Sequence, residues 1–277
     1  MADNIVPVKD HVAQRAHVSS FEQYERLYEQ SVRDPAAFWS REARRIDWLR
    51  DPVEACRADF GQAEVAWFLG GRTNAAHNCV DRHLAERGEQ TALVWVQDEP
   101  GNYVHISFRE LHEQVCRFAN VLKKFGVQKG DRVCIYLPMM PEAVYAMLAC
   151  ARIGAVHSVV FAGFSAESLR DRIVDADCRV VLTANEGLRG GKTIPLKATV
   201  DAAVDGVDAV HTVLVARRTA LEVEMLGGRD HWLADELQRQ RAYCPVEWMD
   251  SEDPLFVLYT SGSTGKPKGQ LHTTGGY

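Results

Sequence analysis

The residues best suited to chemistry lie in one short run that ends eight residues before the last position, Tyr277. Its eleven positions, 259–269, hold three glycines, four serine or threonine hydroxyls and two lysines. Glycine lets backbone N–H groups approach an anion, hydroxyls donate hydrogen bonds to phosphate oxygens, and lysine adds positive charge. A few such bonds, each contributing about 1.5–3 kcal/mol, can hold a polyphosphate. The candidate phosphate-binding residues are Thr260, Ser261, Gly262, Ser263, Thr264, Gly265, Lys266 and Lys268.

The spacing in this run excludes several common motifs. A Walker A loop needs a glycine five residues before its Gly-Lys pair and a serine or threonine after it. Those two positions are Thr260 and Pro267 here. The sequence also lacks the Gly-x-Ser-x-Gly pattern of many hydrolases. The apolar run 255–259 predicts a buried strand, so the loop is expected to follow a strand end.

The loop at 260–269 resembles the signature loop of the AMP-forming adenylating enzymes. That resemblance implies that it holds the β- and γ-phosphates of ATP while a carboxylate attacks the α-phosphate. Such an attack requires the charge of the leaving pyrophosphate to be neutralised and its position to be fixed.

Further segments narrow the resemblance to acetyl-CoA synthetases (acetate–CoA ligases), with propionate–CoA ligases as the alternative. These segments are 67–71, 74–84, 130–139, 158–165 and 271–277, and the resemblance covers nearly the whole sequence from about Phe21. It implies that acetate and MgATP give acetyl-adenylate and pyrophosphate, and that the thiol of coenzyme A then displaces AMP. The implied cofactors are ATP, Mg²⁺ and coenzyme A, and the implied partners are small molecules: acetate, ATP and coenzyme A.

A second candidate site follows the apolar run 180–182, where Arg189 and Lys192 bracket two glycines. A planar guanidinium and a compact ammonium both suit a phosphorylated ligand, although such a turn taken alone is usually a solvated basic loop. The resemblance implies that this segment and residues 161–164 contact the nucleotide end of coenzyme A. Family members often have glycine where this sequence has Ala162. The candidate CoA-binding residues are Phe161, Ala162, Gly163, Arg189, Gly190, Gly191 and Lys192.

Alternating apolar runs and amphipathic stretches after Thr91 predict the α/β class, with a mostly parallel sheet covered on both faces. Before it, helices beginning at Ser19 and Asp34 form an N-terminal extension whose aromatic faces we expect to pack on the main domain. We expect two regions. Residues 1–85 are an extension typical of acetyl-CoA synthetases, and residues 86–277 are a partial AMP-binding domain. We also expect the sheet to be incomplete, with an open apolar edge.

Composition excludes several classes of function. The net charge is −6 and no basic block suggests nucleic acid. No apolar stretch has membrane-spanning length, and the N-terminus does not resemble a signal peptide. The seven cysteines include no Cys-x-x-Cys, and their odd number together with the lack of an export signal favours reduced thiols in a cytoplasmic protein. His77, Cys79 and His83 lack a fourth ligand at a suitable spacing, so no metal site is predicted. Oligomeric state is left open.

In enzymes of this kind, the resemblance implies further parts beyond Tyr277: the adenine and acyl pocket, an acidic residue for the ribose, and a mobile domain with a catalytic lysine. We therefore expect no complete catalytic set in this chain. Three hypotheses stay open: the N-terminal part of an acetate–CoA ligase that is inactive alone, a module that binds CoA or ATP phosphates, and a non-functional truncation product. A direct role for His272 beside the acyl-adenylate also stays open.

Overall fold

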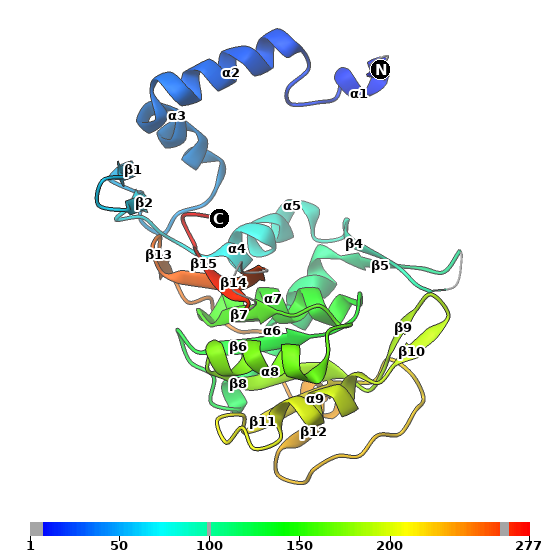
Figure 1. The fold of residues 1–277 in the computed structure, drawn as a ribbon. Coiled ribbons are helices and arrows are strands. Elements are labelled where there is room, and N and C mark those ends of the chain that lie inside the picture. Colours follow the sequence, from blue (N-terminus) through cyan, green and yellow to red (C-terminus); the bar gives the residue numbers. More distant parts are fainter. Residues whose placement is uncertain (1–7, 99–100, 261–265) are drawn as a thin grey trace, which may run out of the picture.

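The computed structural model describes residues 8–98, 101–260 and 266–277. Its centre is a seven-stranded sheet (Figure 1). In spatial order the strands are β12 (Asp230–Trp232), β11 (Thr212–Ala216), β8 (Cys178–Ala184), β6 (Arg132–Tyr136), β7 (Val156–Val159), β14 (Pro254–Thr260) and β15 (Lys268–Thr273). All neighbouring pairs are parallel except β14 and β15, which are antiparallel. The predicted α/β class with a mostly parallel sheet is therefore confirmed.

The central strands are buried on both faces. Residues 180–182 of β8, 213–215 of β11 and 133–136 of β6 are at most 1% exposed. Continuous runs of valine, isoleucine and leucine are typical of parallel strands covered on both sides, because neither face of the strand meets water. These runs fix the middle of the sheet and form the main hydrophobic core.

Four helices cover the sheet: α6 (Phe108–Lys124), α7 (Pro141–Ile153), α8 (Ala166–Asp175) and α9 (Leu196–Val204). Helix α6 packs on α7, and α8 packs on α9. The connection from β6 to β7 runs toward one sheet edge, whereas those from β7 to β8 and from β8 to β11 run toward the other. Since such crossovers are right-handed, α7 lies on one face of the sheet and α8 and α9 on the opposite face.

The helix ends follow from local sequence. Ser107 and Glu110 form a capping box at the start of α6. Pro141 is the first residue of α7, and Gly154 ends that helix at φ 72°, a left-handed conformation that suits glycine. The predicted start of the first helix at Ser19 is wrong by one residue. Ser20 caps α2 by accepting from the Gln23 backbone, while the Ser19 backbone N–H donates to the Gln23 side chain.

Shorter elements surround the sheet. The hairpins pair β1 (Glu54–Asp59) with β2 (Glu64–Leu69), β4 (Thr91–Val96) with β5 (Tyr103–Ser107), and β9 (Gly187–Arg189) with β10 (Lys192–Ile194); β3 (Arg72–Thr73) pairs with β13 (Met249–Asp250). The remaining helices are α1 (Asp10–Ala13), α2 (Phe21–Arg33), α3 (Pro35–Glu42), η1 (Ala43–Arg45), α4 (Ala75–Cys79), η2 (Asp81–His83), α5 (Leu84–Arg87) and α10 (Leu233–Gln238).

The N-terminal helices differ from expectation in how they pack. Figure 1 shows α1 and α2 extending away from the sheet, and no residue of α2 is buried. Phe21, Tyr24 and Tyr28 are 69%, 52% and 58% exposed. The expectation that this aromatic face packs on the main domain is wrong for α2. Its rings stack on one another instead, with centroids 6.0 Å and 6.1 Å apart.

Strand β14 is present as predicted but is not fully buried. Only Leu255 in it is buried, and Leu258 is 43% exposed. The reason is an apolar hollow of about 630 Å³ between β14 and α7, which no described helix fills. Leu271 of the edge strand β15 is 57% exposed. The sheet ends here at strand β15, in which Leu271 is the one large apolar side chain.

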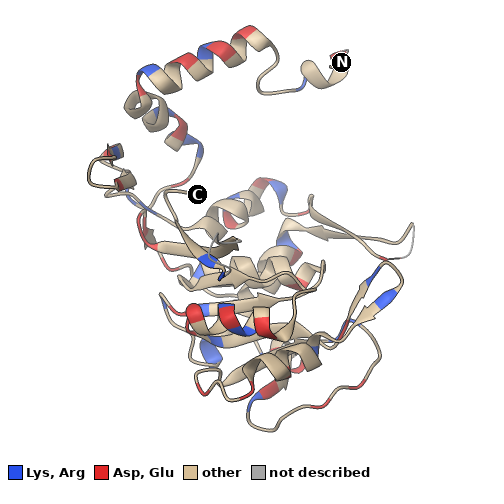
Figure 2. Ribbon diagram, in the orientation of Figure 1, with Lys and Arg blue, Asp and Glu red and all other residues tan. Residues whose placement is uncertain are grey.

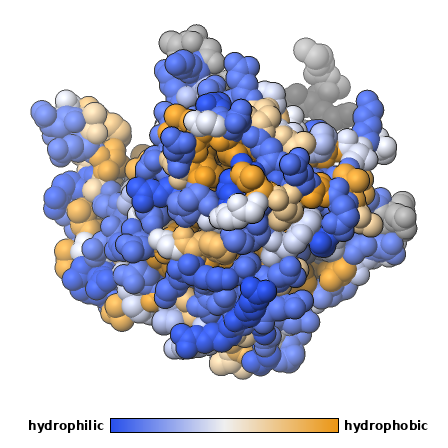
Figure 3. All heavy atoms as spheres, turned by 90° about the horizontal axis from the view of Figure 1, so that it is seen from below, coloured by the Kyte–Doolittle hydropathy of each residue, from blue (hydrophilic) through white to orange (hydrophobic). Residues whose placement is uncertain are grey.

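The rest of the surface is mixed in character. Figure 3, which views the molecule from below, shows a mainly hydrophilic face interrupted by small hydrophobic patches. In the parts of the chain that the structure describes, no helix has the length and apolar character needed to cross a membrane.

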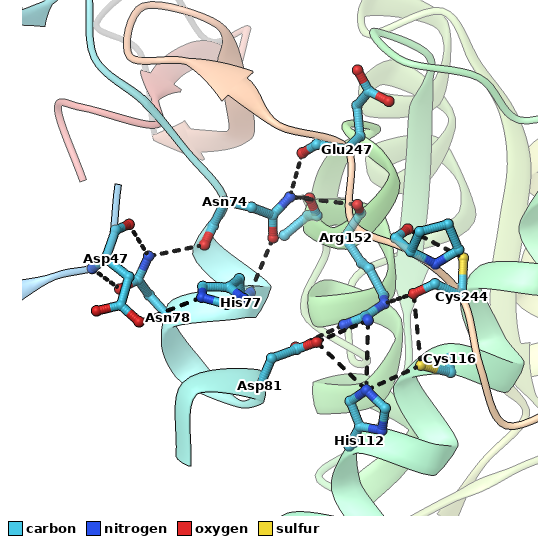
Figure 4. A network of polar contacts seen from close by, with 12 residues as sticks. Asp47, Asn74, His77, Asn78, Asp81, His112, Cys116, Arg152, Cys244 and Glu247 are labelled. Carbon is cyan, nitrogen blue, oxygen red and sulfur yellow. Dashed lines mark hydrogen bonds and ion pairs between the residues drawn. The ribbon is translucent and has the colours of Figure 1, made fainter. Parts of the chain in front are cut away.

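The N-terminal segment is joined to the sheet domain by buried polar contacts (Figure 4). The Asn74 side chain, fully buried, donates to the backbone carbonyls of Ala151 at 2.8 Å and Glu247 at 2.7 Å. Its amide oxygen accepts from the backbone of His77 and so caps α4. One side chain therefore binds the start of α4, the end of α7 and the strand region before β13 together.

Arg152, only 2% exposed, is the cation of this junction. Its guanidinium donates to both carboxylate oxygens of Asp81 at 2.8 and 2.9 Å, and its Nε donates to the Cys244 carbonyl at 2.5 Å. Burial alone would raise the pKa of Asp81, but hydrogen bonds from His112 and Arg152 lower the pKa to about 2. The hydrogen bond to Asp81 in turn raises the pKa of His112 to about 9.

We predict that Asp81→Asn lowers the free energy of unfolding by about 3 kcal/mol, because it leaves a buried guanidinium without its carboxylate. Urea denaturation at pH 7 measures this. Since the pKa of Asp81 is lowered on folding, its contribution is present above the unfolded value, 3.8, and is lost as pH falls through about 2. Glu54→Gln, in the exposed pair with Arg57, is the control and should change stability much less. Equal effects of the two substitutions would contradict the assigned role of Asp81.

Candidate functional site

The candidate residues gather at the carboxyl edge of the sheet, the side at which its parallel strands end. The loop with Phe161 follows β7, the hairpin with Arg189 follows β8, and Thr260 ends β14. These three strands are parallel, so their carboxyl ends lie at the same edge. The helices after neighbouring strands β6 and β7 lie on opposite faces, and so do those after β6 and β8. In open α/β sheets, ligands bind outside the carboxyl ends of strands where this change of face occurs.

Residues 161–164 form a tight turn after β7. The backbone N–H groups of Gly163 and Phe164 both donate to the Phe161 carbonyl, at 2.7 and 3.1 Å, and the Tyr136 hydroxyl donates to the Phe164 carbonyl at 2.8 Å. A Cβ at Gly163 would lie 2.6 Å from the Phe161 ring, so a side chain there would displace the ring. Ala162 is buried in the main core, while Phe161 is 51% exposed. The turn therefore presents the Phe161 ring at the sheet edge.

The second candidate segment is the β9–β10 hairpin. Gly190 and Gly191 have φ values of 55° and 74°, as a two-residue type I′ turn requires, and glycine adopts these without strain. Arg189 and Lys192 pair across the hairpin on either side of this turn, and both are exposed. Figure 2 shows this hairpin as a basic projection. The two glycines that lie between Arg189 and Lys192 in the sequence therefore form the tip of a hairpin.

The base of this hairpin is fixed by Asn185, which is fully buried. Its amide nitrogen donates to the carbonyls of Thr219 and Leu221 at 2.9 and 2.8 Å. Its amide oxygen accepts from the backbone N–H groups of Glu186 and Arg218. One side chain thus joins the loops after β8 and β11, and this limits where the hairpin can point.

The structure brings the two candidate CoA-binding segments together. The Arg189 guanidinium carbon lies 4.9 Å from the centroid of the Phe161 ring, within the range of a cation–π contact. These residues are 28 positions apart in the sequence. Their contact makes a composite surface with one aromatic face and two cations, a chemistry that suits a base and phosphate groups.

The phosphate-binding candidates are described only in part. Ser261, Gly262, Ser263, Thr264 and Gly265 lie outside the described residues. Thr260 and Lys268 form a cross-strand pair of β14 and β15, so they mark the two stems of the loop. Lys266 and Lys268 are exposed, and Lys266 lines a hollow of about 290 Å³ with Tyr259 and residues of α8.

Contacts at the stem of this loop were not predicted. The Tyr259 hydroxyl donates to the Asp175 carboxylate at 2.6 Å, and the Arg172 guanidinium lies 5.6 Å from the Tyr259 ring centroid. A signal existed in the sequence. Arg172 falls between Leu169 and Ile173 on the buried face of α8, where helical periodicity predicts an apolar residue. A charged residue at such a position indicates a specific partner.

Other candidates lie apart from these loops. The His272 ring stacks on Phe256, with centroids 4.5 Å apart, and its direct role stays a prediction. The two histidines considered as zinc ligands have different neighbours: the ring of His77 lies 3.4 Å from the carboxylate of Asp47, and the ring of His83 packs on Phe108. Within the described ranges, no three His, Cys, Asp or Glu side chains are grouped so as to hold a metal ion.

Comparison with known proteins places the chain among known families. Residues 80–277 match the family model described as AMP-binding enzyme, and residues 24–79 match the model described as acetyl-coenzyme A synthetase N-terminus. The chain is 57% identical over 275 residues to acetyl-coenzyme A synthetase 2 of Pseudomonas aeruginosa, a match that covers 99% of this chain and 42% of that protein.

Other relatives give the same picture. Identity is 58% over 256 residues to acetyl-coenzyme A synthetase 2 of Pseudomonas putida, covering 92% of this chain and 40% of that protein. Identity to the acetyl-coenzyme A synthetase of Bradyrhizobium sp. is 53% over 279 residues, covering 100% of this chain and 43% of that protein. The chain thus spans about two fifths of the length of these curated relatives. The family model that matches most of its residues shows that this chain belongs to the AMP-binding enzymes.

Proposed function

We propose that this chain carries the CoA-nucleotide and ATP-phosphate binding parts of an AMP-forming acetate–CoA ligase. The observation that carries the proposal is the contact between Phe161 and Arg189 at the carboxyl edge of the sheet, at which the loop after β14 also begins. The names of the relatives favour acetate as the acyl substrate. Propionate is the alternative.

The electrostatics of this edge support anion binding. Arg189, Lys192, Lys266 and Lys268 are all exposed, and within the described part of the chain none of them forms an ion pair with a carboxylate. An unpaired cation at the surface attracts phosphate groups without first losing a partner. The guanidinium of Arg189 can bind a phosphate bidentately, while its position over Phe161 orients it.

In the proposed reaction, an acetate oxygen attacks the α-phosphorus of ATP and pyrophosphate leaves. The CoA thiol then attacks the acyl carbon, loses its proton, and displaces AMP. In this chain, Thr260, Lys266 and Lys268, with the five loop residues between Thr260 and Lys266, would neutralise the leaving pyrophosphate. Phe161, Ala162 and Gly163 would form one side of the CoA site, and Arg189, Gly190, Gly191 and Lys192 the other.

Mg²⁺ fits this proposal only as an ion that arrives with the nucleotide. The described residues offer no cluster of carboxylates or imidazoles for it, so its ligands would be phosphate oxygens and water. A cytoplasmic location is also part of the proposal. Each of the seven cysteines is a free thiol, and five of them are buried, which suits a reducing compartment.

We expect Arg189→Gln to weaken CoA binding about tenfold, because a charge-assisted contact to phosphate is lost. Isothermal titration calorimetry measures the affinity, and raising the salt concentration should reduce the difference between variant and wild type. The control is Arg241→Gln. Arg241 is also exposed and lies 5.9 Å from an aromatic ring, that of Tyr243, but its backbone carbonyl accepts a hydrogen bond from Asn120 of α6, so it belongs to a different segment from the hairpin. Equal loss in both variants, or none in Arg189→Gln, would overturn the assignment of the hairpin.

A catalytic test separates the ligase hypothesis from that of a binding module. We predict no acetate-dependent ATP–pyrophosphate exchange with this chain alone, because the acyl and adenine pockets are expected in the part of the relatives that it does not span. Acetyl-coenzyme A synthetase 2 of Pseudomonas aeruginosa serves as the positive control. Exchange above background would show that the adenylation site assembles from these 277 residues, contrary to the proposal.

A further inference from the structure

Lys197 is a buried cation that the proposed reaction does not use. It lies near the start of α9, just after the β9–β10 hairpin, and is 1% exposed. Its ammonium group donates to the Asp201 carboxylate at 2.7 Å, to the Asp230 carboxylate at 2.8 Å and to the Glu224 carbonyl at 3.0 Å. An ammonium has three N–H donors, so each of them has an acceptor in place of water.

Arg229 completes this buried network. Its guanidinium contacts Asp201 at 2.5 Å and Asp230 at 2.6 Å, so two cations face two carboxylates. Burial alone would raise the pKa of Asp230, but hydrogen bonds from Arg229 and Lys197 lower it, so this carboxylate stays charged. Buried ion pairs contribute little net stability relative to packed apolar side chains, because desolvation offsets their attraction. Their bonds are directional, however, and they fix the positions of the segments that carry them.

Most partners of Lys197 belong to one connection. Glu224 and Arg229 lie in the segment 217–229, which joins β11 to β12, and Asp230 is the first residue of β12. We call this segment the 217–229 loop. Asp201 lies on α9, one turn after Lys197. Lys197 therefore binds the end of the 217–229 loop to the helix that follows the hairpin.

The start of the same loop is held from the other side of the hairpin. The Asn185 side chain, just before β9, binds the backbone of Arg218, Thr219 and Leu221. The Thr219 hydroxyl also donates to the Glu186 carboxylate at 2.7 Å. The residues on both sides of the hairpin thus hold the 217–229 loop, one group at its start and the other at its end.

The 217–229 loop is in turn bound to other elements. The Arg218 guanidinium pairs with Asp98 and lies 5.2 Å from the centroid of the Trp95 ring in β4. The Arg217 guanidinium lies 3.6 Å from the centroid of the Trp232 ring in β12. Because the loop is itself fixed by these contacts, it can serve as a support for the hairpin.

The two anchors also meet at the base of the hairpin. The Lys197 backbone N–H donates to the Asn185 carbonyl at 3.3 Å. Between them, β9 and β10 pair over three positions up to the glycine turn. A two-stranded hairpin has little stability of its own, so its direction depends on how its base is held.

We propose that Lys197 and Asn185 are positioning residues for the CoA-nucleotide site. By fixing the base of the hairpin against the 217–229 loop, they hold Arg189 beside the Phe161 ring. The identity of the ligand rests on the function proposed above, and neither positioning residue touches it. A hairpin that is already held in its binding orientation loses less freedom when the ligand binds, so the affinity is higher.

Calorimetry of CoA binding to the whole chain tests this role. We expect Lys197→Met to weaken binding about fivefold, because the hairpin must then be ordered by the ligand. Thr219→Val removes the hydroxyl that bonds Glu186, leaves the buried charges in place, and should weaken binding about threefold. The control is Asp81→Asn, which also removes one partner of a buried ion pair but lies at the N-terminal junction. It should keep the wild-type affinity.

A double substitution separates positioning from a general loss of stability. If Lys197 acts through Arg189, adding Lys197→Met to Arg189→Gln should weaken binding little beyond Arg189→Gln alone, because the positioned cation is already absent. If Lys197→Met does not fold, Thr219→Val takes its place in both measurements. Losses that multiply in the double variant, or wild-type affinity in the single variants, would overturn the proposal.

Amide hydrogen exchange without ligand gives a readout that does not depend on the proposed function. Lys197→Met and Thr219→Val should speed exchange at 187–194, whereas Asp81→Asn should not, since the hairpin opens locally. If the wild-type chain does not bind CoA, the proposed function fails and exchange decides the positioning role. Faster exchange in the hairpin then supports that role, and unchanged exchange overturns it.

Discussion

The arrangement of the candidate site depends on one constraint, the handedness of the connections between parallel strands. Strand β6 connects toward one edge of the sheet through α7, while β7 and β8 connect toward the other through α8 and α9. Right-handed crossovers then place these helices on opposite faces. The loops at the carboxyl ends of the strands therefore diverge. Phe161, Arg189 and Thr260, which are distant in the sequence, all lie at the carboxyl edge of the sheet.

The two edges of the sheet differ in their electrostatics. Near the amino ends of the strands, the Arg152 cation is buried and fully engaged by Asp81 and a backbone carbonyl. That pair and the Asn74 hydrogen bonds join the N-terminal segment to α7. At the carboxyl edge, the cations of the hairpin and of the loop stems are exposed to solvent. Removing one partner of the buried pair would leave an uncompensated charge, whereas the exposed cations can attract an anionic ligand.

The fold could be predicted from sequence because its signals are local and agree with one another. The capping box at Ser107, the proline at the start of α7 and the apolar runs of β6, β8 and β11 are local signals for elements that the structure contains. The prediction that β14 is buried was wrong, because periodicity cannot show whether another element covers a strand. The prediction that α2 packs on the main domain was wrong for the same reason: an amphipathic helix has an apolar face whether or not a partner is present.

Part of the candidate site could also be predicted, where its signals are local. Glycines between basic residues predicted a turn at 189–192, since the turn chemistry is local, but the strands β9 and β10 on either side of it were not predicted. The contact between Arg189 and Phe161 was not predictable from spacing, because it depends on the order of strands in the sheet. The position of Arg172 was also missed. Its place on the buried face of α8 was visible, but the Tyr259 ring beside it comes from a distant strand.

The central claim is that the turn after β7 and the hairpin after β8 form a single CoA-nucleotide site. Amide hydrogen exchange of the whole chain with and without CoA tests it most directly. We predict that saturating CoA slows exchange at 161–164 and at 187–194 together, with little change near α6 and residues 240–244. Protection confined to one segment, or protection of the hollow between β14 and α7 instead, would contradict it.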